Sequence, residues 1–392
     1  MDLERYGRQM LVTGAGGQAE VSKLRVLVVG AGGLGCSCLA YLVGAGVSAV
    51  TICDADVVEV SNLHRQPLHT EAGALAREKK VESAARALRA LNPNVEIRAV
   101  SKRAGFDDAT ADLVKSHDVV ADCSDNVGTR YLLNDLCFLA GKSLYSASAL
   151  GREGSLSTYH WLSCCYRCAH PRPATIEAKR SCADRGVLGP VPGALGALQA
   201  LEILTRAPDD DIAVFDGREL RRFRKPPKRP NCQLCGVAAT IRSVQDSKDS
   251  CAAMGLVVVE GAGFGTIAPA PPPPLPEDAV ATCADLARAL SRNGAVVLDV
   301  RDPNQFSMCS LPGSVSVPIA DIIATNGDAV LEKLPLDEPN KSIFVLCRRG
   351  VDSRLATSAL RAHSALRERV CRHVEGGLQA WRATVDPAFP AY

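Results

Sequence analysis

The amino-acid sequence predicts an α/β protein with two successive α/β domains, the first larger than the second. Its 392 residues exceed the roughly 150 that one domain usually takes. Strand-like and helix-like patterns alternate up to about residue 236, and a shorter alternation resumes at about residue 279. Hydrophobic residues make up 47% of the chain and charged residues 22%, which is ordinary for globular proteins. The formal net charge of +2 argues against a nucleic-acid coat or a polybasic membrane anchor.

The first part of the chain predicts a parallel sheet with helices on both faces. Its strand candidates are short apolar runs at residues 25–29, 49–53, 95–99, 119–121 and 144–146. Its helix candidates are residues 34–43, 76–91, 129–140 and 193–205. Such alternation is typical of βαβ units, whose parallel strands are buried on both sides. A membrane span over residues 26–53 is disfavoured, because glycines interrupt that uncharged segment.

After about residue 236 the pattern breaks down and then restarts. Prolines clustered at residues 271–276 favour polyproline II, so we expect a semi-rigid spacer there. Further along, helix candidates at 284–291 and 353–362 accompany strand candidates at 295–300 and 342–347. We therefore predict a first domain at residues 1–250, a linker at 251–277 and a second domain at 278–392. The sequence leaves the role of residues 236–260 open.

A glycine-rich turn follows the first predicted strand. Residues 30–35 read Gly-Ala-Gly-Gly-Leu-Gly and open a predicted helix, so the backbone can approach phosphate at the helix N-terminus. Asp54 ends the next predicted strand, where a ribose-binding carboxylate belongs. These features predict a nucleotide site without specifying the nucleotide.

The residues after Asp54 favour a triphosphate. Residues 61–66 read Ser-Asn-Leu-His-Arg-Gln, and Lys79 and Lys80 follow. A guanidinium and an ammonium beside the ribose carboxylate can neutralise negative charge as pyrophosphate leaves.

The predicted strand 119–121 is followed by residues with oxygen ligands, Asp122, Asp125 and Asn126. A carboxylate at this edge can hold Mg²⁺ against phosphate oxygens. The alternative is a solvated loop charge, which we favour for Asp122 but not for Asp125.

Two CxxC pairs, Cys165 with Cys168 and Cys232 with Cys235, predict a metal site. Four thiolates are the tetrahedral set of a closed structural zinc centre, so we expect one zinc per chain. The wide separation of the pairs indicates a clip between distant segments, and redox chemistry is the alternative for either pair alone. No apolar signal core follows Met1, so the other cysteines among the sixteen are expected in a reducing compartment, as core residues or nucleophiles.

Two further cysteines are candidate nucleophiles. Cys347 follows a strand candidate in the run Cys-Arg-Arg-Gly-Val-Asp-Ser-Arg, where arginines and backbone N–H groups stabilise a thiolate or a persulfide anion. A phosphatase-type loop is disfavoured, because Arg354 lies one position too far along. Cys182 lies in an arginine-flanked loop rich in glycine and proline, which suits a nucleophile.

Together these motifs resemble two known families. Residues 5–10 (Arg-Tyr-Gly-Arg-Gln-Met), the glycine turn, residues 61–66, both CxxC pairs and the Cys182 loop resemble the ubiquitin-activating-enzyme-like superfamily. The Cys347 loop and residues 375–381 (Glu-Gly-Gly-Leu-Gln-Ala-Trp) resemble a rhodanese. Their order resembles the eukaryotic adenylyltransferase–sulfurtransferases that serve the ubiquitin-related modifier and molybdopterin synthase. The implied fold is a Rossmann-like, ubiquitin-activating-type adenylation domain with a structural zinc site, followed by a smaller α/β rhodanese domain.

The resemblance also implies residue roles. ATP or its Mg²⁺ would be contacted by Gly33, Asp54, Ser61, Asn62, Leu63, His64, Arg65, Lys80, Asp125 and Asn126. Arg8 would reach ATP across a homodimer interface, Cys182 would take the activated glycine of a carrier as a thioester, and Cys347 would carry the persulfide. The segment before Lys80 is about two residues longer than the family pattern, so Lys79 is an alternative. Gln305 stands where rhodanese-like domains often have Glu, which would remove an ion pair with Arg301.

The mechanism implied by the resemblance begins with a ubiquitin-like sulfur-carrier protein, whose C-terminal glycine is adenylated with release of pyrophosphate. The Cys347 persulfide would then attack the acyl carbon, directly or after transfer to Cys182, and reductive cleavage would leave a thiocarboxylate. That sulfur would serve tRNA wobble-uridine 2-thiolation, molybdopterin synthesis or both. A cysteine desulfurase is the expected kind of persulfide donor, and the cytoplasm is the expected compartment. Neither direct nucleic-acid binding nor membrane contact is implied.

Three other interpretations stay open on the sequence alone. One is an NAD-linked oxidoreductase fused to a sulfurtransferase, which an ATP–pyrophosphate exchange assay would separate. Another is a carrier-conjugating enzyme with an inert rhodanese domain, disfavoured because Cys347 keeps its arginines. The third is a non-catalytic scaffold, disfavoured because the glycine turn, Arg65 and Cys347 are all present.

Overall fold

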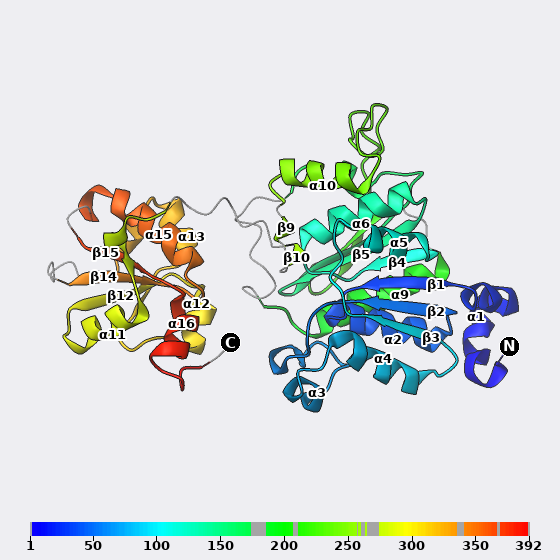
Figure 1. Ribbon diagram of the computed structural model, residues 1–392, viewed down its shortest axis with the longest axis horizontal. Helices are drawn as coiled ribbons and strands as arrows, with labels where there is room; N and C mark the ends of the chain where they lie inside the picture. The colour runs from blue at the N-terminus through cyan, green and yellow to red at the C-terminus, as the bar shows by residue number, and fades with distance from the viewer. Residues whose placement is uncertain are drawn as a thin grey trace. The chain divides into compact units, whose positions relative to one another are not determined.

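The chain forms two compact units in the computed structural model, Met1–Ala268 and Pro269–Tyr392 (Figure 1). The structure describes residues 2–173, 186–206, 211–256, 258–259, 263–264, 274–334, 341–366 and 369–390.

The first unit is built on an eight-stranded sheet with the order β3-β2-β1-β4-β5-β6-β7-β8. The strands are β1 (Arg25–Val29), β2 (Ala49–Cys53), β3 (Glu96–Val100), β4 (Val119–Asp122), β5 (Ser143–Leu150), β6 (Glu153–Tyr159), β7 (Asp211–Phe215) and β8 (Leu220–Arg224). The five strands β1 to β5 pair in parallel, as predicted. Beyond β5 the sheet continues with β6, β7 and β8, which were not among the predicted strands and which pair antiparallel. Gly151 and Arg152 join β5 to β6, and so short a connection can only reverse the chain.

Helices cover both faces of this sheet, with α2 and α4 on one face and α5 and α6 on the other (Figure 1). The helices are α1 (Leu3–Val21), α2 (Gly33–Ala45), α3 (Glu71–Leu75), α4 (Lys80–Leu91), α5 (Asp108–Lys115), α6 (Val127–Leu139), α7 (Tyr166–Ala169), α9 (Pro190–Thr205) and α10 (Val244–Ala253), with a 3-10 turn η1 (Val60–Asn62). Helix α9 completes the core on the α2 side. Each face of the sheet therefore has its own hydrophobic core.

Three segments differ from the sequence prediction. The helix predicted from residue 76 begins only at Lys80, because Lys79 forms a β-bridge with Val57. The helix α1 was not predicted. The predicted loss of order after residue 236 is wrong for α10, which Ser243 caps and which buries Cys251 in the second core.

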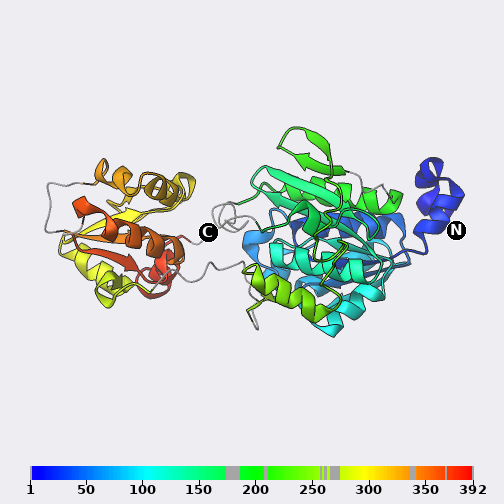
Figure 2. The ribbon, with the colours of Figure 1, turned by 90° about the horizontal axis from the view of Figure 1, so that it is seen from above.

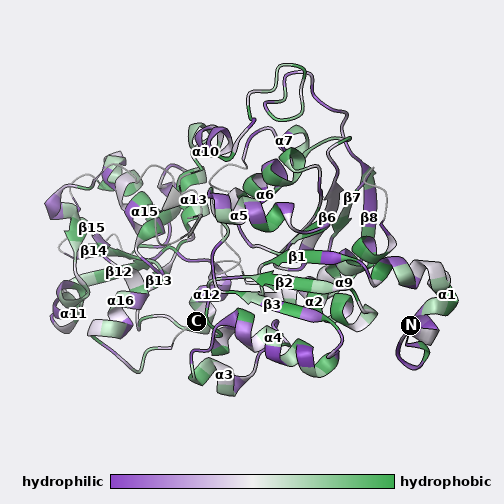
Figure 3. Cartoon of the chain, turned by 45° about the vertical axis from the view of Figure 1, so that its right-hand side comes forward, coloured by the Kyte–Doolittle hydropathy of each residue, from purple (hydrophilic) through white to green (hydrophobic). Residues whose placement is uncertain are grey.

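The last strand of the sheet has an exposed, charged edge. All five residues of β8 are exposed, and three of them are arginines, so the strand is largely purple in Figure 3. Charged edge strands discourage pairing with other chains. Among the described residues, the structure contains no helix with the length and apolar character that a bilayer crossing requires.

The second unit is a five-stranded parallel sheet with the order β11-β15-β14-β12-β13. Its strands are β11 (Val280–Ala281), β12 (Ala295–Asp299), β13 (Val315–Ser316), β14 (Ser342–Leu346) and β15 (Cys371–Val374). Its helices are α11 (Cys283–Ser291), α12 (Pro303–Met308), α13 (Ile319–Ala324), α14 (Asp328–Leu331), α15 (Val351–Ala362) and α16 (Gly377–Thr384). The four elements predicted here are present, with α15 starting two residues earlier than expected. Two hydrophobic clusters form its core.

Candidate active site and metal centre

A cavity of about 310 Å³ opens at the carboxyl ends of β1, β2 and β4 in the first unit. The chain leaves β1 for β2 on one side and reaches β4 on the other, which is the switch point where α/β sheets bind ligands. Seven of the residues predicted to contact a nucleotide line it: Gly33, Asp54, Asn62, Arg65, Lys80, Asp125 and Asn126. Four others do not: Arg8, Ser61, Leu63 and His64.

Two glycines of the turn, Gly30 and Gly33, lie close to neighbouring atoms and leave little room for a side chain. Gly30 has a φ of +102°, and a Cβ there would lie 2.6 Å from Cys123 O. A Cβ on Gly33 would lie 3.0 Å from both Arg65 O and a Pro192 side-chain carbon. Asp54 holds the turn, because its Oδ2 accepts a 2.8 Å hydrogen bond from Ala31 N. The backbone that faces the cavity is thus fixed in shape before any ligand arrives.

The guanidinium of Arg65 is held in place by hydrogen bonds to residues close to it in the sequence. Its Nη2 donates to Asn62 Oδ1 at 2.6 Å, and its Nη1 lies 3.4 Å from Ser61 O and 3.2 Å from His64 Nε2. Ser61 and His64 therefore hold the guanidinium without lining the cavity themselves.

The structure places Lys80, and not Lys79, at the cavity. The Lys80 side chain is 8% exposed, and its Nζ lies 3.1 Å from Asp56 Oδ2. Lys79 Nζ instead donates to Ala55 O at 3.1 Å, and Lys79 does not line the cavity.

Sequence reasoning missed four charged residues of the cavity wall, Asp56, Glu59, Lys102 and Arg103. Arg103 pairs with Asp56 at 3.0 Å. Burial works against ionisation of Asp56, but Lys80 and Arg103 outweigh it and hold the pKa of this carboxyl below its ordinary value. Lys102 and Arg103 could have been predicted from their position, because they follow the predicted strand 95–99 at the same sheet edge as Asp54.

The two aspartates after β4 have different surroundings. Asp122 is fully buried and accepts hydrogen bonds from Ser124, Ser146 and Arg130, so its oxygens are already used within the fold. Asp125 is exposed and lines the cavity. Asn126 caps α6, accepting from Thr129 N at 2.8 Å. Only Asp125 of the two carboxylates faces the space where a phosphate would lie.

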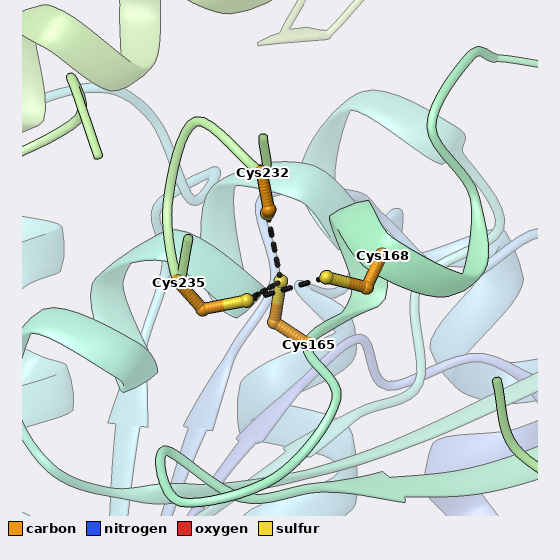
Figure 4. A group of neighbouring side chains, drawn as sticks. All are labelled: Cys165, Cys168, Cys232 and Cys235. Atoms are coloured by element: carbon orange, nitrogen blue, oxygen red, sulfur yellow. Dashed lines mark hydrogen bonds between the residues drawn. The ribbon is translucent and has the colours of Figure 1, made fainter. Parts of the chain in front are cut away.

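The four predicted metal-ligand cysteines come together (Figure 4). Their sulfur atoms all lie within 4.8 Å of one another. Cys165 Sγ is 3.6 Å from Cys232 Sγ and 3.3 Å from Cys235 Sγ, and Cys168 Sγ is 3.3 Å from Cys235 Sγ. A tetrahedral zinc with bonds of ~2.3 Å would hold its sulfurs ~3.8 Å apart, so a small expansion accommodates the ion.

Further details fit a closed structural site. Arg229 N lies 3.3 Å from Cys168 Sγ, a backbone donor of the kind that supports a metal-bound thiolate. The adjacent Cys164 is outside the group, with its Sγ 3.5 Å from Cys165 O. Four sulfur donors fill a tetrahedral shell, which leaves no position for a substrate.

The second unit places Cys347 between β14 and α15. The residue is 2% exposed, and Gly350 N donates to its Sγ at 3.1 Å. Residue 377, which packs against the Cys347 carbonyl, has to be glycine, because a Cβ on Gly377 would lie 2.3 Å from Cys347 O. Gln305 is uncharged and cannot form the predicted family ion pair with Arg301, and Arg301 instead pairs with buried Asp299 at 2.6 Å. Cys182 lies outside the described residues.

Comparison with known proteins matches both units. The ThiF family matches residues 6–237 and the rhodanese-like domain matches residues 282–384. The adenylyltransferase and sulfurtransferase MOCS3 of Mus musculus is 40% identical over 423 residues, covering 100% of this chain and 87% of that protein. The protein of that name from Anopheles gambiae is 39% identical over 406 residues, covering 100% and 89%. A crystal structure of E. coli MccB with MccA-N7isoASN has a TM-score of 0.53 at 19% identity, over 60% of this chain and 75% of that one, a likeness of fold alone.

Proposed function

The chain belongs to the ThiF family and, with its rhodanese-like domain, to the bifunctional adenylyltransferase–sulfurtransferases, and from this premise we propose how its residues divide the reaction. The protein adenylates the C-terminal glycine of a ubiquitin-like sulfur-carrier protein and transfers sulfur to it, in tRNA thiolation and molybdenum-cofactor synthesis. The observation that carries the division of roles is that one chain holds both a cavity lined by Arg65 and Lys80 at a switch point and a separate cysteine loop.

The first unit performs adenylation. A carboxylate oxygen of the carrier glycine attacks the α-phosphorus of ATP, and pyrophosphate leaves with its electron pair. The turn at Gly32 and Gly33 lies against the phosphates, and Arg65 and Lys80 stabilise the charge that develops on them. Gln66 also lines the cavity, and its buried Oε1 has no hydrogen-bond partner among the described residues.

Two further contributions complete the nucleotide site. Asp125 would hold Mg²⁺, which would neutralise negative charge on the phosphates. Arg8 would come from a second copy of the chain in a homodimer. In support, Arg8 is exposed on α1, which stands clear of the sheet in Figure 2 and also exposes Leu11 and Val12 at 87% each.

The second unit supplies sulfur. A donor such as a cysteine desulfurase transfers its terminal sulfur to Cys347, so that the donor S–S bond breaks as a new one forms. The persulfide anion then attacks the acyl carbon, and AMP leaves. The attack takes place on the adenylate or on a Cys182 thioester formed from it, and an external thiol reductant supplies two electrons that cleave the acyl disulfide and release the thiocarboxylate. The cysteine set 165, 168, 232 and 235 would hold one structural zinc and takes no part in these steps.

The decisive experiment is mass spectrometry of a carrier incubated with the full chain, ATP and a persulfide donor. The expected product gains one sulfur and loses one oxygen, and it requires ATP. An unchanged carrier mass with intact ATP–pyrophosphate exchange would overturn the sulfur-transfer role. Absence of exchange in the folded protein would overturn the adenylation role.

A further inference from the structure

Two buried side chains lie behind Cys347 and form a hydrogen-bonded chain with it. Cys347 Sγ is 3.4 Å from Ser353 Oγ on α15. Ser353 Oγ is in turn 2.9 Å from His373 Nδ1 on β15. Ser353 is fully buried, and His373 is 1% exposed. Strand β15 lies between β11 and β14, so His373 stands on an interior strand.

We propose that His373 is a positioning residue which, through Ser353, aims a hydroxyl O–H at Cys347 Sγ and so favours the thiolate that receives sulfur. This rests on the proposed function of Cys347. It adds Ser353, which contacts the cysteine, and His373, which reaches it only through Ser353.

The direction of the two hydrogen bonds decides the effect. When His373 Nδ1 carries a hydrogen, it donates to Ser353 Oγ, and the serine hydroxyl donates to Sγ. When Nδ1 is bare, the serine hydroxyl donates to the histidine, and its oxygen can then only accept from a thiol S–H. The first arrangement stabilises an anionic sulfur, since hydrogen bonds to charged groups are the stronger ones.

The surroundings of His373 keep it neutral. Burial lowers the pKa of His373 to about 4, Arg354 acts in the same direction, and Glu375 opposes it. Gly350, which donates its N–H to Cys347, also leaves room for the ring, because a Cβ there would lie 3.2 Å from His373 Cε1. A neutral imidazole with one hydrogen can orient the serine without placing a second positive charge in the loop.

The step that benefits is sulfur loading. The Cys347 thiolate attacks the terminal sulfur of a donor persulfide, a new Sγ–S bond forms, and the donor leaves as its own thiolate. The donor S–S bond breaks as the new S–S bond forms, so the exchange needs no further oxidant. Ser353 and His373 act before the attack, by raising the fraction of Cys347 that is ionised.

The test is the pH profile of Cys347 alkylation by iodoacetamide in the full chain, followed by mass spectrometry of the Cys347 peptide. Ser353→Ala should slow alkylation at neutral pH roughly tenfold and move the profile to higher pH, as loss of one hydrogen bond to a charged group predicts. His373→Leu should do the same, and His373→Asn, which keeps a donor near the Nδ1 position, should restore most of the rate. The double variant Ser353→Ala/His373→Leu should be no slower than Ser353→Ala.

Thr357→Ala is the matched control, because Thr357 is a buried hydroxyl on α15 that bonds Ser353 O at 2.8 Å and does not face the sulfur. It should leave the profile unchanged. A wild-type profile in folded Ser353→Ala would overturn the proposal, as would additive effects in the double variant. Since alkylation needs no carrier and no ATP, this outcome is independent of whether the carrier is thiocarboxylated.

Discussion

The guanidinium of Arg167 and the carboxylate of Asp135 form a buried two-point ion pair, with Nη2 2.6 Å from Oδ2 and Nε 2.8 Å from Oδ1. Their side chains are 5% and 0% exposed. Arg167 lies inside the first CxxC pair, Asp135 lies on α6, and Arg167 Nη1 also donates to Ser250 on α10 at 3.0 Å. The pair therefore fastens the thiol cluster to two helices of the first unit.

Asp135→Ala should destabilise the first unit by about 3–5 kcal/mol, because it leaves the Arg167 charge buried without its partner. Chemical denaturation followed by circular dichroism measures the loss. Asp249→Ala is the control, since this aspartate is exposed on α10 and should cost less than about 0.5 kcal/mol. Equal stabilities of the two variants would contradict a structural role for the pair.

Cys168→Ser should lower zinc content and melting temperature together, because a structural site contributes its binding energy to folding. Metal analysis of the purified chain should give one zinc per wild-type chain. Cys164→Ser changes a buried cysteine next to the cluster but outside it, and should keep the zinc. Full zinc occupancy in Cys168→Ser would refute the assignment of the ligands.

Arg65→Ala should abolish ATP–pyrophosphate exchange with the carrier and leave sulfur transfer from thiosulfate to cyanide intact, since the two chemistries reside in different units. Lys80→Ala should reduce exchange by about 100-fold, a typical loss for one charge-stabilising group. Lys79→Ala should leave exchange near wild type, because Lys79 bonds Ala55 O away from the cavity. Loss of sulfur transfer in folded Arg65→Ala would argue against the division of labour.

The second unit should lose stability on acidification. Burial lowers the pKa of His373 from 6.5 to about 4, so the unfolded chain binds a proton there before the folded one does. Stability is fully present above pH 6.5 and falls as the pH drops toward about 4. Fluorescence of buried Trp381, in a Trp161→Phe background, reports unfolding of this unit. His373→Asn should reduce the slope, and an unchanged slope would show that other groups cause it.

The sequence predicts features formed by residues that are close in the chain better than features formed by distant residues. The glycine turn, the CxxC spacing and the Cys347 loop depend on residues close in the chain, and they were found in advance. The antiparallel strands β6 to β8 depend on a two-residue turn at Gly151, which the apolar pattern did not reveal. The meeting of Ser353 with His373 depends on β15 pairing with β14, and such non-local pairing leaves no spacing in the sequence.

The same distinction separates Asp122 from Asp125. Both follow one strand. Only the packing shows that the Asp122 carboxylate accepts hydrogen bonds from Arg130 and two serines, while Asp125 faces the cavity. Lys79 and Lys80 are likewise alike in sequence, and the β-bridge from Lys79 to Val57 decides which one turns inward.

Cys347→Ala should still form the acyl-adenylate, because the nucleotide cavity belongs to the first unit. It should not yield thiocarboxylated carrier with a persulfide donor, since the loop then contains no thiol that can carry the persulfide sulfur. Cys371→Ala is the control, because Cys371 is a buried cysteine of the same unit whose pKa burial raises to about 11, and it should be unreactive. Exchange assays and carrier mass spectrometry measure the two steps separately.

Free sulfide at high concentration should bypass the Cys347→Ala defect, because it can attack the acyl-adenylate itself and displace AMP. Such rescue would place the defect at sulfur delivery and leave adenylation unaffected. Thiocarboxylate formation by Cys347→Ala at the wild-type rate from a persulfide donor would have the opposite meaning. The second unit would then serve to dock a partner, and Cys182 would become the leading candidate for the sulfur-carrying thiol.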